Sequence, residues 1–214
     1  MFNELFLQNS LKIDFLKKFF LLHNIMSSCL RIYYSNGQKK RELWLLNGLL
    51  HREDGPAIEE WFENGQKKIE QWYINNYFYR ENGPSVQEWF ENGKNKIQKW
   101  WLKDEFHRKN GPAWIEYFEN GQKKIEKWYL NGKLYRKIYK PAWIEYFENG
   151  QKKIEKWYVN GKLHTNFVKP EIKGFRKNKP AWIEYFKNGQ NKKELWCLNN
   201  KIYKNEPLIQ KLYF

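Results

Sequence analysis

Four arginines recur at equivalent positions of a repeating pattern, and their chemistry suits the binding of anions. They are Arg52, Arg80, Arg108 and Arg136. A guanidinium group forms paired hydrogen bonds with phosphate and carboxylate groups, so this row predicts an anion-binding surface. A competing interpretation, which the pattern slightly favours, is that each arginine caps a kinked backbone, because three of the four stand before a Gly-Pro pair.

An insertion within residues 165–179 carries a second group of basic residues. The group consists of Lys169, Lys173, Arg176, Lys177 and Lys179, against the single acid Glu171. Insertions in repeat proteins map to loops on one face, which is often the binding face. We therefore predict that this segment is a second anion-binding candidate.

Three histidines at equivalent positions indicate packing rather than metal binding. His51, His107 and His164 alternate with Tyr79, Tyr135 and Tyr203. Because the histidines are two repeats apart, they cannot converge on one ion. The sequence also shows no nucleophile beside a base, no glycine-rich phosphate loop and no metal-ligand spacing. We expect no catalytic residue, no metal, no cofactor and no enzymatic activity.

Tryptophan occupies one fixed place in the repeat, eight residues after the Asn of each main Asn-Gly turn. These residues are Trp44, Trp72, Trp100, Trp128, Trp157 and Trp196. We predict a structural role in which the indoles stack along the array and bury roughly 150–250 Å² each. The alternative, a ladder on which nucleobases stack, requires exposed indoles.

The turns that position these residues define six units within residues 27–214. The main turns lie at Asn36, Asn64, Asn92, Asn120, Asn149 and Asn188, and a second turn follows each one eleven residues later. Segments such as 113–118 and 124–130 are β-branched and aromatic, which is typical of strands. If the Gly-Pro site is a kink within one long strand, each unit is a single hairpin. The sequence then predicts an all-β fold, an elongated antiparallel meander of about twelve strands.

Charge patterning predicts how the strands of each hairpin pair. A three-residue loop ending in a glycine bulge places glutamates opposite lysines, whereas a two-residue loop places Glu116 opposite Ile125. The pairs predicted by the bulge are Glu60 with Lys68, Glu88 with Lys96, Glu116 with Lys124, Glu145 with Lys153, and Glu184 with Lys192. We expect this bulge register.

Residues 1–26 differ from the array. Leu11, Phe15, Phe19 and Leu22 recur at helical spacing, and Ser10 suits an N-cap, so we predict a short helix that caps the first unit. A membrane-surface anchor, or translation from Met26, are the alternatives.

Composition limits the class of the protein. The 214 residues carry a net charge of +15 and 19% aromatic side chains, which indicates a folded chain attracted to anionic surfaces. Cys29 and Cys197 lie at opposite ends of the array, so we expect an intracellular, reducing compartment. No apolar run is long enough for a spanning helix.

The repeat resembles a known family of units. The segments Trp128-Tyr-Leu-Asn-Gly-Lys-Leu-Tyr-Arg136 and Trp157 to His164 are similar to MORN-type repeats, and His51 to Ala57 is similar to the variant MORN-like repeats of giant viruses and bacteria. The resemblance covers about residues 31–205. The resemblance implies hairpin ribbons that scaffold proteins and in some cases bind phospholipids. Lipid binding does not transfer residue by residue, because Gly-Pro replaces the family's Gly-x-Gly.

These observations lead to an ordered set of functional expectations. We expect a non-enzymatic repeat scaffold that binds an unknown protein partner through an extended aromatic and basic sheet face. Binding to anionic phospholipid surfaces and nonspecific nucleic-acid binding are the alternatives, and self-association through edge strands is a further possible contact. If the Asn-, Lys- and Ile-rich composition reflects a viral genome, the host cytoplasm or the virion is the expected location.

Overall fold

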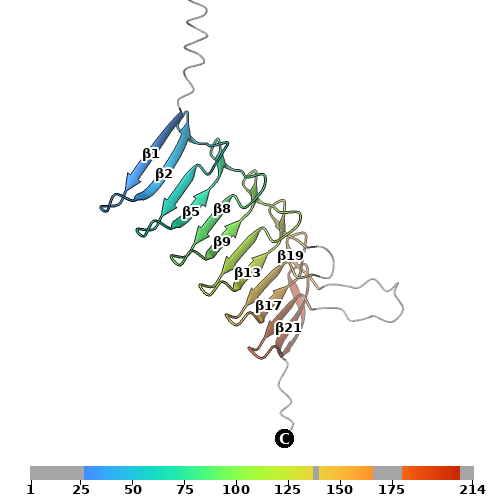
Figure 1. The fold of residues 1–214 in the computed structure, drawn as a ribbon. Helices are drawn as coiled ribbons and strands as arrows, with labels where there is room; N and C mark the ends of the chain where they lie inside the picture. The colour runs from blue at the N-terminus through green and yellow to red at the C-terminus, as the bar shows by residue number, and fades with distance from the viewer. Residues whose placement is uncertain (1–26, 137–139, 166–179, 208–214) are drawn as a thin grey trace, which may run out of the picture.

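The computed structural model describes residues 27–136, 140–165 and 180–207, and all regular structure in these ranges is β-strand. The hairpins lie side by side, each displaced from the preceding one, from the N-terminal to the C-terminal end of the array (Figure 1). The predicted all-β antiparallel meander is therefore confirmed. The predicted helix within residues 1–26 and the basic insertion residues, from Lys169 to Lys179, lie outside the described residues.

One long sheet runs the length of the array, and each strand in it pairs antiparallel with the next. In spatial order its main path is β1 (Ser27–Tyr33), β2 (Lys39–Leu46), β4 (Ile58–Trp61), β5 (Lys67–Gln71), β8 (Val86–Trp89), β9 (Asn95–Lys99), β12 (Trp114–Tyr117), β13 (Lys123–Lys127), β16 (Trp143–Tyr146), β17 (Lys152–Lys156), β20 (Trp182–Tyr185), β21 (Asn191–Leu198) and β22 (Lys201–Pro207). Strand β3 (Leu49–Leu50) pairs with the end of β2.

A short side hairpin is inserted between successive main hairpins. The four side hairpins are β6 (Tyr73–Ile74) with β7 (Tyr77–Phe78), β10 (Trp101–Leu102) with β11 (Glu105–Phe106), β14 (Tyr129–Leu130) with β15 (Lys133–Leu134), and β18 (Tyr158–Val159) with β19 (Lys162–Leu163). Their turns lie where the sequence predicts second turns. Both central residues have positive φ, as in Asn75 (51°) and Asn76 (65°), which is the two-residue hairpin turn that asparagine and glycine favour.

The prediction of one long strand kinked at Gly-Pro is wrong, because both arms of the four inner units are interrupted, whereas β2 and β21 continue through Trp44 and Trp196. Trp72 marks the interruption: its N–H donates to the Ser85 carbonyl (2.8 Å), and its carbonyl accepts from the Tyr79 N–H (3.1 Å). Residues 79–85 therefore leave the hairpin and return beside the same tryptophan. Proline has no N–H to continue the ladder, so the chain forms a loop there and each of the four inner units contains two hairpins.

The predicted register is also wrong, although the predicted loop is present. Gly121 closes the three-residue loop with a φ of +91°, but a second bulge between Glu116 and Tyr117 places Glu116 opposite Ile125. The five glutamate–lysine pairs are therefore not direct cross-strand partners. Among them and within the described residues, Glu184 and Lys192 alone form an ion pair, at 2.9 Å, as diagonal neighbours. The lysines lie over phenylalanine rings at 5.8–6.0 Å instead.

The observed register gives the sheet two distinct faces, because neighbouring residues on a strand point in opposite directions. One face, here called the loop face, carries Ile115 and Glu126, which lie opposite each other and are buried. The other, called the stripe face, carries Trp114 opposite Lys127. A fully buried small residue opens the second to sixth units at one repeated position: Ala57, Ser85, Ala113, Ala142 and Ala181.

Candidate functional site

The structure brings the arginine row and the tryptophan row together. Each guanidinium lies over an indole: Arg52 over Trp44, Arg80 over Trp72, Arg108 over Trp100 and Arg136 over Trp128, with centroid distances of 4.4, 4.2, 3.8 and 3.6 Å. Each Nη1 also donates to a proline carbonyl of its own loop, at 3.1–3.4 Å. This contact is the backbone capping that the sequence offered as the competing interpretation.

Glycine makes room for the guanidinium on its second side. A Cβ added to Gly111 would lie 2.8 Å from Cζ of Arg108, and Gly55 and Gly83 are equally crowded by Arg52 and Arg80. The arginine therefore occupies a slot between an indole and a glycine backbone. The fourth loop has Lys140 in place of this glycine and one residue more between its arginine and its proline, yet Arg136 keeps the same two contacts.

The arginines differ in their electrostatic surroundings. Arg52 has carboxylate partners, Asp54 at 3.0 Å and Glu59 at 3.4 Å. Within the described residues no carboxylate lies at ion-pair distance from Arg80, Arg108 or Arg136. Burial lowers the pKa of Arg108 and of Arg136, although a guanidinium remains charged at neutral pH. Arg108 and Arg136 are thus partly desolvated cations with no carboxylate at ion-pair distance in the described part of the chain.

The fifth unit replaces the arginine with a buried threonine. The Thr165 N–H donates to the Cys197 carbonyl (2.7 Å), and the threonine Oγ1 accepts from the Cys197 N–H (2.9 Å). Trp157 of this unit is 4% exposed, whereas the other five tryptophans of the row are partly exposed. The structure therefore places all six indoles in the array, with the deepest burial where no arginine covers the ring.

Two of the three histidines contact the next unit, whereas Nδ1 of His164 lies 2.6 Å from the carbonyl oxygen of the adjacent Thr165. Nδ1 of His51 lies 2.8 Å from Oδ1 of Asn75, and Nδ1 of His107 lies 2.8 Å from Oδ1 of Asn131, so each ring binds the turn of the following side hairpin. Across the described ranges, no three His, Cys, Asp or Glu side chains gather closely enough to bind a metal ion.

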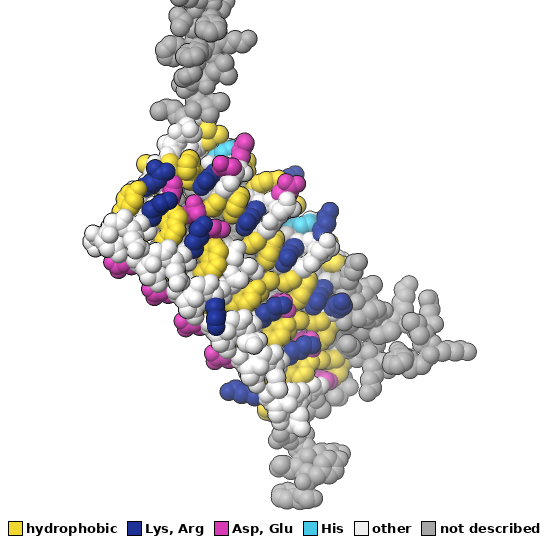
Figure 2. Space-filling model, viewed as in Figure 1, with side chains coloured by type: hydrophobic (Ala, Val, Ile, Leu, Met, Phe, Trp, Pro, Cys, Tyr) yellow, Lys and Arg dark blue, Asp and Glu magenta, His cyan; other side chains and the backbone are white. Residues whose placement is uncertain are grey.

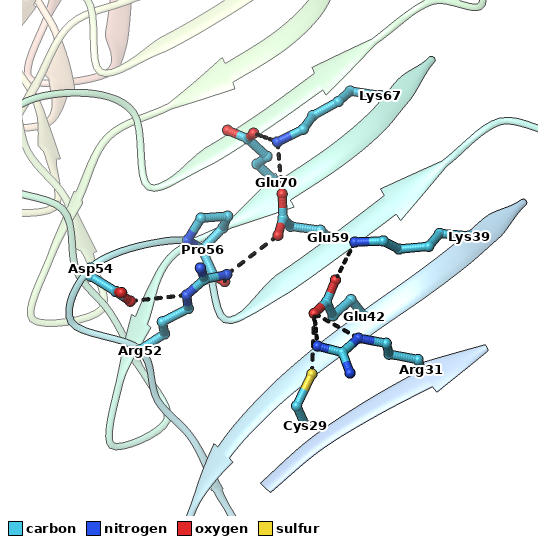
Figure 3. A network of polar contacts seen from close by, with 10 residues as sticks. All are labelled: Cys29, Arg31, Lys39, Glu42, Arg52, Asp54, Pro56, Glu59, Lys67 and Glu70. Atoms are coloured by element: carbon cyan, nitrogen blue, oxygen red, sulfur yellow. Dashed lines mark hydrogen bonds and ion pairs between the residues drawn. The ribbon is translucent and has the colours of Figure 1, made fainter. Parts of the chain in front are cut away.

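Buried carboxylates form a second row on the loop face. Glu126 accepts from Lys123 Nζ (2.5 Å) and from the Tyr146 hydroxyl (2.7 Å). Glu155 has the equivalent partners Lys152 and Tyr185. The N-terminal members of this network are drawn in Figure 3, where Lys67 links Glu59 and Glu70. These ion pairs join residues three apart because the second bulge brings them to one face.

Glu42 is the member of this row with the most donors. It accepts from Lys39 Nζ (2.9 Å), Arg31 Nε (3.1 Å) and Cys29 Sγ (3.1 Å) (Figure 3). Burial opposes ionisation of this carboxyl, but the hydrogen bonds outweigh burial and lower the pKa of Glu42 from 4.5 to about 2. Folding therefore favours the ionised carboxylate.

We expect Glu42→Gln to destabilise the protein at neutral pH and to have little effect in acid. A carboxyl whose pKa is lowered by folding contributes stability above its unfolded pKa, and this contribution is lost as the pH falls from 4.5 towards 2. At pH 7 the loss should be about 1–3 kcal/mol, the usual effect of breaking a charged hydrogen bond. Urea unfolding of both proteins at several pH values measures it. A difference that stays constant down to pH about 2.5 would contradict the assignment.

An alternating row of lysines and tryptophans crosses the stripe face. We call it the Lys–Trp stripe; in spatial order it consists of Lys99, Trp114, Lys127, Trp143, Lys156, Trp182 and Lys193. The first six are direct cross-strand neighbours, whereas Lys193 is diagonal to Trp182, which lies opposite Leu195. Each ammonium lies 4.1–5.9 Å from the centroid of a neighbouring ring. Seven adjacent strands contribute, which corresponds to roughly 29 Å at the usual strand spacing of ~4.8 Å.

Sequence reasoning missed this stripe, although a signal was present. The run Pro-Ala-Trp-Ile-Glu-Tyr occurs at 112–117, 141–146 and 180–185, and its tryptophan is the stripe residue. In the first three units the same position holds Leu30, Ile58 and Val86, so the pattern shared by all units does not include this tryptophan. Two of the glutamates of the run are within hydrogen-bonding distance of the stripe: Trp114 Nε1 donates to Glu116 and Trp143 Nε1 to Glu145, both at 3.0 Å.

Comparison with known proteins gives no relative. No family model matches the chain, and neither a curated protein nor a solved structure is significantly similar to it. Within the ranges described by the structure, no helix has the length and apolar character needed to cross a membrane.

Proposed function

We propose that this protein is a non-enzymatic repeat scaffold that binds a protein partner across the Lys–Trp stripe. The observation that carries the proposal is the continuity of the stripe over seven strands of one rigid sheet. Aromatic side chains with a polar surround are typical of protein interfaces. The resemblance of the repeat to MORN-type units, which scaffold other proteins, supports the same role.

The charge around the stripe favours a protein over a polyanion. Glu116, Glu145 and Glu184 lie on the same face, so its lysines are interleaved with acids. Figure 2 shows hydrophobic side chains along one side of the molecule with cations between them, and acidic side chains along the edge formed by the main turns. That edge carries the exposed glutamates Glu63, Glu91, Glu119 and Glu148. A mixed-charge surface suits a folded partner better than a membrane or a nucleic acid.

The arrangement of the tryptophans also argues against base stacking. Lys127 lies between the rings of Trp114 and Trp143, at 4.3 and 4.1 Å from their centroids. Stacking of a nucleobase requires an open ring face, and here ring faces are occupied by ammonium groups. The free cysteines Cys29 and Cys197 support placement in a reducing, intracellular compartment.

Replacing the three stripe tryptophans with valine tests the proposal. The variant Trp114→Val/Trp143→Val/Trp182→Val carries the residue that Val86 already supplies at this position, so we expect it to fold. Wild-type protein immobilised as bait should retain its partner from an extract of the source cells in about 0.5 M salt, where the Debye length is only a few Å. The valine variant should retain at least about tenfold less partner than the wild type does.

A surface control distinguishes the stripe tryptophans from exposed cations that are not part of the stripe. Lys124→Gln/Lys153→Gln removes two exposed lysines that lie over phenylalanine rings rather than over the stripe tryptophans, and it should retain the partner. Equal recovery of the same partner by the wild type and the valine variant would refute the stripe as the binding surface. Retention of nucleic acid alone, released steeply by salt, would also refute it.

A further inference from the structure

The loops that begin at Arg52, Arg80, Arg108 and Arg136 are here called loops 1 to 4. A cleft of about 930 Å³ lies between loops 3 and 4. Its floor is formed by Lys123, Glu126 and Trp128 of the loop face, and Tyr129 and Leu130 of a side hairpin form one wall. Among the described residues, the loops contribute Arg108, Lys109, Asn110, Gly111, Pro112, Tyr135, Arg136 and Lys140.

The same backbone frame forms clefts with very different charge along the array. The cleft between loops 1 and 2, of about 280 Å³, is lined by two arginines and two glutamates. The cleft between loops 2 and 3, of about 320 Å³, is lined by three cations (Arg80, Arg108 and Lys109) and one glutamate. The cleft between loops 3 and 4 is lined by five cations and one glutamate. Positive charge therefore accumulates in one direction.

The single acid of the third cleft is already engaged. Glu126 pairs with Lys123 and accepts from Tyr146. The other four cations, Arg108, Lys109, Arg136 and Lys140, have no acidic partner at ion-pair distance within the described part of the chain. Two of them are guanidinium groups held in place by an indole and a proline carbonyl, which takes one of the five N–H donors of each group.

Loop 1 shows that the fold does not require this excess of charge. There Arg52 stacks on Trp44 as its equivalents do, but Asp54 and Glu59 neutralise it. In loop 3, Asn110 stands in place of Asp54, Ile115 in place of Glu59, and Lys109 in place of Glu53. Relative to loop 1, loop 3 has three fewer acids and one more cation, yet its arginine keeps the same contacts with the indole and the proline carbonyl. Because the fold does not need this change of charge, we attribute the change to the binding of a ligand.

We propose that the cleft between loops 3 and 4 binds a small molecule that carries two or more phosphate charges on an apolar or aromatic body. A fixed, planar guanidinium group can donate two parallel hydrogen bonds to two oxygens of one phosphate, and the two lysines add mobile donors at the rim. Tyr129, Leu130 and Tyr135 offer an apolar wall for the body. The volume lies within the range of ordinary small-molecule sites.

Calorimetric titration of the full chain with pyrophosphate and with ATP, in about 50 mM salt, tests the site. The wild type should bind at least one of them with a Kd below about 1 mM. Lys109→Glu/Asn110→Asp installs the residues of loop 1 in loop 3 and should weaken binding at least about tenfold. The reciprocal change Glu53→Lys/Asp54→Asn in loop 1 should not weaken it.

Vesicles of phosphatidylcholine, with and without a phosphorylated inositol lipid, distinguish a headgroup from a free phosphate. Binding to the phosphorylated vesicles alone, lost in Lys109→Glu/Asn110→Asp, identifies a lipid source, whereas binding of ATP or pyrophosphate identifies a soluble one. Lys140→Gln provides a second, exposed position if the double variant fails to fold.

Two results would overturn the proposal: no binding of any of these probes by the wild type, or equal binding by the wild type and the loop variants that fold. The valine variant of the Lys–Trp stripe should bind the phosphate probes as the wild type does. A failure of either proposal therefore leaves the other intact.

Discussion

Replacing Trp157 with alanine should lower the free energy of unfolding by about 3–5 kcal/mol, the usual cost of deleting a buried aromatic side chain. Trp157 is the most buried indole of its row, with 4% of its surface exposed. Its backbone also joins two elements, because its N–H donates to Ala181 (2.9 Å) and its carbonyl accepts from His164 (3.0 Å). These bonds survive the substitution, so the loss reports the burial of the side chain and the cavity left behind.

The array should respond locally to this loss. Units of a repeat protein contact only their neighbours, so a weak unit separates the stable units on either side. We expect denaturant unfolding of Trp157→Ala to split into two transitions, with the units after Trp157 unfolding first. Trp157→Phe, which keeps most of the apolar area, should retain a single transition. A change below about 1 kcal/mol, measured by circular dichroism, would show that this indole does not stabilise the array.

Enlarging Ala113 to leucine should have the second largest effect, a loss of about 1–3 kcal/mol or more. Ala113 is fully buried, and its backbone bonds to both neighbouring segments: its N–H donates to Lys127 (2.9 Å) and its carbonyl accepts from Trp100 (2.8 Å). With the backbone fixed on both sides, the extra methylenes can be accommodated only by displacing neighbouring side chains.

Ala113→Ser is the matched control for this prediction. The third unit has Ser85 at the same position, where it is 1% exposed and its Oγ accepts from the Trp101 N–H at 3.4 Å. The fold thus already accommodates a hydroxyl there, and the serine variant should differ from wild type by less than about 1 kcal/mol. Thermal unfolding of both variants and of the wild type measures these differences in stability. Equal melting temperatures for Ala113→Leu and wild type would show that space is left beside this residue.

Local signals in the sequence were sufficient for the fold class and for the positions of the turns. Asn-Gly pairs favour positive φ, and the β-branched and aromatic segments between them favour strands, whatever lies beside them in space. Gly121 and Asn131 accordingly adopt the backbone conformations expected of them. Both properties belong to a few neighbouring residues, which is why they could be predicted.

The predicted register failed because it depends on a bulge that the loop does not specify. The three-residue loop at Gly121 is present, but an extra residue, Lys124, bulges out beyond it. A shift of one residue turns every following side chain to the other face, so four of the five predicted glutamate–lysine pairs became glutamate–isoleucine pairs, and Glu184 lies opposite Lys193. The observed register produces the buried row of carboxylates that contains Glu126, and the charge pattern along the sequence did not predict this row.

The sequence alone therefore determined an all-β array of hairpins, the place of each turn and the repeated tryptophan and arginine positions. Only the tertiary structure decided that Arg52, Arg80 and Arg108 each lie between an indole and a glycine, that Lys127 lies between two tryptophans, and that the loops enclose clefts of increasing positive charge. The physical reason is the range of the interactions. Turns are set by neighbours along the chain, whereas these surfaces arise where side chains from different strands and successive units meet across the sheet.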